Sequence, residues 1–80
     1  MSGKVVASFE FDAPFFNRKG VKTRLIEATR EVDLWLEENE SLLSTTFRVD
    51  LIGQRSTVEG LLDHPHVKPL TRGGVTMTAT

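Results

Sequence analysis

The stretch from Asn17 to Ser41, NRKGVKTRLIEATREVDLWLEENES, has the spacing of one long amphipathic helix. An advance of about 100° per residue from Val21 places six apolar side chains on one stripe, which is wide enough to cover a sheet or another helix. The six residues of the stripe are Val21, Leu25, Ala28, Val32, Trp35 and Leu36. Asn17 is the expected N-cap of this helix.

The charges of this predicted helix run against its dipole. Four basic residues lie near its beginning and five acidic residues near its end, whereas a helix favours acidic groups at its N-terminus and basic groups at its C-terminus. The basic residues are Arg18, Lys19, Lys22 and Arg24, and the acidic residues are Glu31, Asp33, Glu37, Glu38 and Glu40. The reversed charge gradient predicts that charged groups of another element or molecule offset its unfavourable interaction with the helix dipole.

A second copy of the same helix would provide that compensation. Ile26, Arg30 and Leu34 are spaced i, i+4, i+8 and form a second stripe roughly opposite the first. In an antiparallel pair of helices, the basic start of one would face the acidic end of the other, and Ile26 and Leu34 would pack around Arg30. We therefore expect a homodimer with these three residues in its interface. Phe15 and Phe16, or an exposed sheet edge, are the alternative contact surfaces.

The rest of the chain predicts three strands and a short second helix. Apolar and polar residues alternate in Lys4–Asp12, Thr45–Ile52 and Val75–Thr80, as in half-buried strands. Gly53 is expected to stop the second strand. The sequence STVE, residues 56–59, has the spacing of a capping box and predicts a helix start. Residues 66–70 lie in a segment with two prolines and predict a possible extra edge strand.

The predicted order of elements is therefore β-α-β-α-β. Each predicted strand has one apolar face and one polar face, unlike the continuous apolar strands of buried parallel sheets. The sequence thus predicts an α+β protein, a two-layer sandwich with helices on one face of a mixed or antiparallel sheet.

Length and composition predict a single small domain over residues 1–80. The chain has no cysteine, which excludes disulfides and thiolate metal ligands, and its formal net charge is −1. No apolar run approaches the roughly 20 residues of a membrane span. We expect a soluble, cytoplasmic protein without a cofactor. A core of this size gives marginal stability, and self-association is one way to supplement it.

Two other classes of function stay open. Arg18, Lys19, Lys22 and Arg24 could bind a nucleic acid or another polyanion at the start of the predicted helix. The near-neutral net charge does not favour nucleic acid, because nucleic-acid-binding domains are usually strongly basic. Glu10, Arg48 and Asp50 could do acid–base chemistry if a dimer closed a pocket over the polar face of the sheet.

Metal binding has only weak support in the sequence. His64 and His66 are separated by one residue, and no third ligand occurs at a recognisable spacing. The best-supported reading is a small, soluble, non-enzymatic protein-interaction or assembly module. Its expected partner is a second copy of itself or another protein.

Overall fold

The computed structural model describes residues 3–12 and 20–80. In these ranges the chain forms four strands, two α-helices and one 3₁₀-helix. In chain order they are β1 (Lys4–Asp12), α2 (Val21–Ala28), β2 (Asp33–Glu40), β3 (Thr45–Gln54), α3 (Arg55–Leu62), η2 (Lys68–Thr71) and β4 (Thr76–Ala79).

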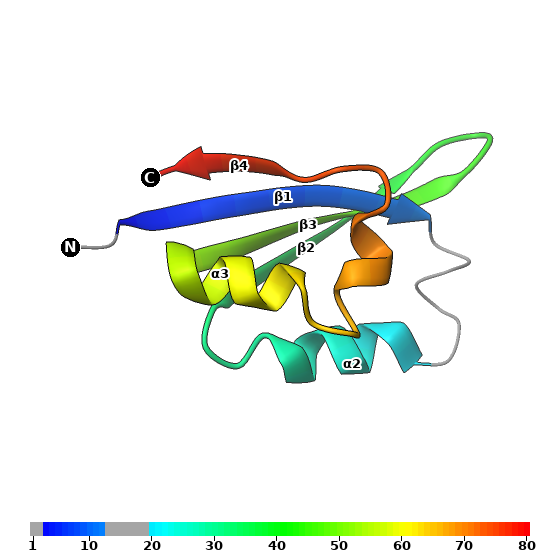
Figure 1. Cartoon of the computed structure of the whole chain (residues 1–80). Helices are drawn as coiled ribbons and strands as arrows, with labels where there is room; N and C mark the ends of the chain where they lie inside the picture. Colours follow the sequence, from blue (N-terminus) through cyan, green and yellow to red (C-terminus); the bar gives the residue numbers. More distant parts are fainter. Residues whose placement is uncertain (1–2, 13–19) are drawn as a thin grey trace.

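The four strands form one sheet in the order β2-β3-β1-β4, and all neighbouring pairs are antiparallel. β1 pairs with β3 from Lys4 opposite Gln54 to Asp12 opposite Thr46. At the other end of the molecule from the β2–β3 hairpin, Thr80 donates its backbone N–H to the carbonyl oxygen of Lys4 at 3.1 Å (Figure 1). The strand order and the β-α-β-β-α-β succession of the elements together define the split β-α-β arrangement of ferredoxin-like folds.

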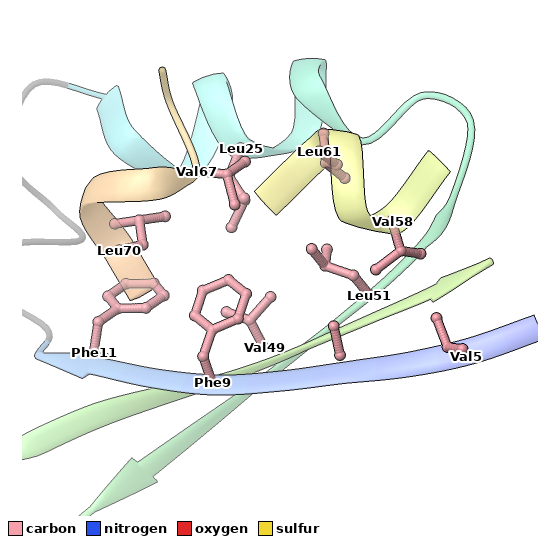
Figure 2. Close-up of a cluster of buried hydrophobic side chains, with 11 residues drawn as sticks. Val5, Phe9, Phe11, Leu25, Val49, Leu51, Val58, Leu61, Val67 and Leu70 are labelled. Carbon is pink, nitrogen blue, oxygen red and sulfur yellow. The ribbon is translucent and has the colours of Figure 1, made fainter. Parts of the chain in front are cut away.

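The core lies between one face of the sheet and the helices. Alternate residues of β1 and β3 point towards the helices because successive side chains of a strand lie on opposite faces. Figure 2 shows Phe9, Val49 and Leu51 directed from the sheet towards Leu25 of α2 and Leu61 of α3. The buried apolar residues are Val5, Ala7, Phe9, Phe11, Leu25, Val49, Leu51, Val58, Leu61, Val67 and Leu70. The other face of the sheet is not covered by any helix of the described residues (Figure 1).

The prediction of a long helix over 17–41 and the order β-α-β-α-β are wrong, although the α+β class holds. The described part of this stretch contains the helix α2, which ends at Ala28, and the strand β2. The Thr29 hydroxyl donates hydrogen bonds to the carbonyl oxygens of Leu25 and Ile26 at 3.0 and 3.1 Å, at the end of the helix. β2 pairs with β3 along its full length, from Asp33 opposite Ile52 to Glu40 opposite Thr45. This non-local pairing outweighs the local helical periodicity.

The change from helix to strand also relocates Trp35. In β2 the side chains of Leu34 and Leu36 lie on the core side of the sheet and are partly buried against it. Trp35 lies between them on the opposite face, and 60% of it is exposed. The residue assigned from the sequence to the core stripe of a helix is therefore a surface residue of the open sheet face.

The predicted edge strand at residues 66–70 is also wrong. His64 begins a series of turns in which its carbonyl oxygen accepts hydrogen bonds from the backbone N–H groups of Val67 and Lys68. The 3₁₀-helix η2 follows at Lys68–Thr71. Val67 and Leu70, three residues apart, are both buried, and this i, i+3 spacing is typical of a helical turn.

The other predicted elements differ from the structure mainly at their ends. β1 has the predicted bounds, and β4 occupies part of Val75–Thr80. α3 begins at Arg55, and no side-chain capping hydrogen bond is present at its start, so the predicted capping box does not form. β3 continues through Gly53, where a Cβ atom would lie 2.8 Å from Cγ1 of Val32. Glycine allows the turn before β2 to pack closely on β3 at this point.

We expect the substitution Gly53→Ala to lower the free energy of unfolding by about 1–3 kcal/mol, the usual cost of overpacking. Gly60→Ala in α3 is the matched control, because a Cβ atom there would meet nothing within 4 Å. This second substitution should be neutral or stabilise the protein by up to about 1 kcal/mol. Urea denaturation measures both. Equal stabilities of the two variants would contradict the close packing of Val32 on Gly53.

The single tryptophan tests the placement of β2. Because Trp35 is mostly exposed, its fluorescence should have a water-exposed emission maximum in dilute protein and should be strongly quenched by acrylamide. Urea denaturation should shift the emission maximum little. A blue-shifted emission that acrylamide does not quench, measured at the same low concentration, would contradict the exposed position on the open sheet face.

Candidate interaction surfaces

Among the described residues, the most exposed large apolar side chains lie at the tip of the β2–β3 hairpin. Its four-residue connection, Ser41-Leu42-Leu43-Ser44, carries two leucines that are 105% and 97% exposed. The described part of the molecule measures 44 × 22 × 18 Å, and the hairpin projects beyond the helices at one end (Figure 1). The two leucines therefore have no part in the core.

The turn at this tip is held in shape by the residue that precedes the leucines. The Ser41 backbone N–H and its hydroxyl both donate to the carbonyl oxygen of Ser44 at 2.9 Å. In return, the Ser41 hydroxyl accepts the backbone N–H of Ser44 at 3.1 Å and that of Leu43 at 3.4 Å. Such local side-chain bonds stabilise turns. Leu42 and Leu43 are thus presented on a preformed turn.

The strand that leads to the tip is strongly acidic. β2, with the sequence DLWLEENE, contains Asp33, Glu37, Glu38 and Glu40 and no basic residue. Among the described strands its outer edge has no partner, because β2 is the first strand in the order. Acidic side chains on an edge strand disfavour pairing with a second copy of the same edge. The hairpin therefore combines an apolar tip with a negatively charged arm.

The structure separates the residues expected at a helix–helix dimer interface. Ile26 is 49% exposed on α2, Arg30 is exposed in the turn after that helix, and Leu34 packs against the core from β2. These three residues do not form one stripe, because no single helix carries them. Phe15 and Phe16 lie outside the described residues.

The predicted anion-binding cluster is described only in part. Arg18 and Lys19 lie outside the described residues. Lys22 and Arg24 are exposed on α2, which begins after Gly20, a residue with φ of 67°. The N-terminus of this eight-residue helix carries no acidic residue in its first turn.

Glu10, Arg48 and Asp50 do lie together on the open face of the sheet, where the sequence places them. Glu10 of β1 lies opposite Arg48 of β3 in the strand register. Nε of Arg48 lies 3.3 Å from Oδ1 of Asp50, and the same oxygen accepts the Ser8 hydroxyl at 2.7 Å. Arg48 and Glu10 are exposed to solvent. The ion pair thus joins two residues of β3, and Ser8 of β1 adds a cross-strand hydrogen bond to it.

The two histidines contact each other. Their ring centroids are 4.9 Å apart, and Nδ1 of His64 accepts the backbone N–H of His66 at 3.1 Å. Within residues 3–12 and 20–80, no group of three or more potential metal ligands of the His, Cys, Asp or Glu type is brought together.

The sequence contained a signal for the hairpin tip that the helical interpretation concealed. Turn positions usually hold glycine, asparagine, aspartate, proline or serine. ESLLST, residues 40–45, places two leucines between two serines, outside any strand of alternating pattern. With a predicted helix that ends at Ser41, the leucines fall in the connection to the strand predicted from Thr45. At the tip of a hairpin they need an explanation, because the turn geometry does not require them.

Comparisons with known proteins define the fold but not the function. No family model matches the chain, and no curated protein matches it. Among solved structures, the chain is similar to "De novo designed protein Foldit4", with a TM-score of 0.60 and 11% identity, over 100% of this chain and 94% of that chain. A likeness at this identity shows the fold alone, and ferredoxin-like folds host many unrelated functions. No helix of the described residues has the length and apolar character to cross a membrane.

The preformed turn can be tested with Ser41→Ala. Loss of the hydroxyl removes the side-chain bonds that hold the turn, each worth about 1 kcal/mol net. We expect the backbone amide of Ser44 to exchange its hydrogen roughly fivefold faster, as measured by NMR. Ser44→Ala is the matched control, because the described bonds of Ser44 use its backbone. Unchanged exchange in Ser41→Ala would show that the hydroxyl does not order the tip.

Proposed function

We propose that this protein is a small, non-enzymatic assembly module whose copies associate through the hairpin tip. The observation that carries the proposal is the complete exposure of Leu42 and Leu43 on an ordered turn. Apolar side chains displayed together in this way are typical of contact sites.

The leucines add little to the fold that presents them. The core cluster contains neither Leu42 nor Leu43, and the bonds that hold the turn come from Ser41 and Ser44. Two serines, asparagines or glycines would serve the hairpin equally well. A contact with another molecule would bury the two leucines, whereas the isolated fold leaves them exposed to water.

The size of the tip predicts a weak contact. Full burial of a leucine contributes about 1.5–3 kcal/mol, so two leucines supply about 3–6 kcal/mol before the cost of association is subtracted. Without that cost, about 3–6 kcal/mol would correspond to dissociation constants of roughly 6 mM to 40 μM, which are the upper limit of affinity for one contact. The assembly should therefore depend strongly on protein concentration.

The acidic arm restricts what the tip can bind. Glu37, Glu38 and Glu40 lie in the strand segment that leads to Ser41. Juxtaposition of like charges disfavours acidic protein surfaces and anionic lipid headgroups as partners. A partner surface must combine an apolar recess with a neutral or basic rim.

Sedimentation velocity over a wide concentration range tests the proposal. We expect the weight-average sedimentation coefficient of the wild-type protein to rise with concentration. The double variant Leu42→Ser/Leu43→Ser should remain a monomer over the same range. Its thermal stability should equal that of the wild type, because the leucines make no core contact.

Ile26→Ser is the matched control, since Ile26 is also an exposed apolar residue but lies on α2. This control should associate like the wild-type protein. Association of the double tip variant at wild-type concentrations would overturn the proposed function, as would a wild-type protein that stays monomeric at the highest soluble concentration.

A further inference from the structure

A small recess between α2 and η2 has the properties required of a surface that receives the tip. It has a volume of about 70 Å³ and lies among Val21, Arg24, Pro65, His66, Pro69 and Leu70. Four of these six residues are apolar. The volume is about half that of an engineered cavity of ~150 Å³ that takes up benzene, which suits one branched aliphatic side chain.

The charge around this recess complements the hairpin. Arg24 and His66 lie in its lining. Lys22 and Lys68 are exposed on the same two elements, α2 and η2. The hairpin arm bears Glu37, Glu38 and Glu40 and no basic residue within β2. An apolar tip that follows an acidic strand thus matches an apolar recess whose lining includes Arg24.

Four other hollows formed by the described residues carry acidic as well as basic side chains. Two of them, on the open side of the sheet and beside η2, include both Glu10 and Asp12. Two more, beside the turn between α2 and β2, include Glu31 together with either Glu27 or Asp33. Each of these would place carboxylates against the acidic arm. The lining of the recess between α2 and η2 contains no acidic residue.

We propose that the recess between α2 and η2 of one copy receives the Leu42–Leu43 tip of another copy. This inference rests on the proposed function and names the acceptor for the same tip. Within one molecule the hairpin points away from the helices (Figure 1), so the contact forms between copies. The donor and acceptor surfaces are different parts of the chain, so the contact is heterologous and joins copies head to tail into chains or closed rings.

A mixing experiment with two half-defective variants tests the acceptor. The tip variant Leu42→Ser/Leu43→Ser keeps its recess. The recess variant Arg24→Glu/His66→Glu keeps its tip but surrounds the recess with negative charge. Each variant alone should be monomeric in sedimentation velocity, with association at least tenfold weaker than that of the wild type. An equimolar mixture should form dimers and no larger species, because each dimer has one usable tip and one usable recess.

The control for added negative charge is Lys4→Glu/Arg30→Glu, since neither residue lines the recess. This control should assemble like the wild type. Circular dichroism should show that every variant is folded. A recess variant that assembles like the wild type would overturn the acceptor but leave the tip contact standing. If each variant alone is monomeric and their mixture also stays monomeric, the recess between α2 and η2 is not the acceptor of the tip. Assembly of the tip variant alone would instead reject the proposed function itself.

Discussion

The pairing of β1 with β3 is the constraint on which the rest of this structure depends. Its register sets Ala7 opposite Leu51 and Phe9 opposite Val49, so that both strands present their apolar residues to the same side. Every other element is placed by this pair: β2 and β4 extend it at either side, and the helices cover its apolar face. A shift by one residue would turn the apolar residues of one strand to the open face. Leu25, Val58 and Leu61 of the helices pack on the apolar face of the sheet, and this packing favours the register in which the apolar residues of both strands face the helices.

The elements whose pattern is local could be predicted from the sequence. The alternation of KVVASFEFD gives β1 its bounds, because a half-buried strand leaves a period of two in the sequence. The placement of Glu10, Arg48 and Asp50 on one polar face follows from the same alternation. The hairpin tip was not predicted as a site. Residues 17–41 were assigned to a helix from their sequence, so the predicted fold contained no β2–β3 hairpin on which Leu42 and Leu43 could be exposed.

The segment DLWLEENE shows why the rest could not be predicted. Trp35 and Leu36 fit a helical stripe, whereas Leu34 and Leu36 fit one face of a strand, so periodicity alone does not decide between them. The deciding contact is the pairing with β3, which brings together residues that no local pattern relates. The charge distribution along residues 17–41 argues against a single helix. A long helix would carry basic residues at its start and acidic residues at its end, against its dipole, whereas a strand has no comparable dipole.

The two ends of the described chain have a consequence for how an assembly could be organised. The N–H···O bond from Thr80 to Lys4 holds them side by side, at the end of the sheet away from the hairpin tip. A domain fused to either end would therefore emerge on the side remote from Leu42 and Leu43. A row of copies joined head to tail could then carry such cargo at regular intervals, one per subunit, without obstructing the contacts that build the row.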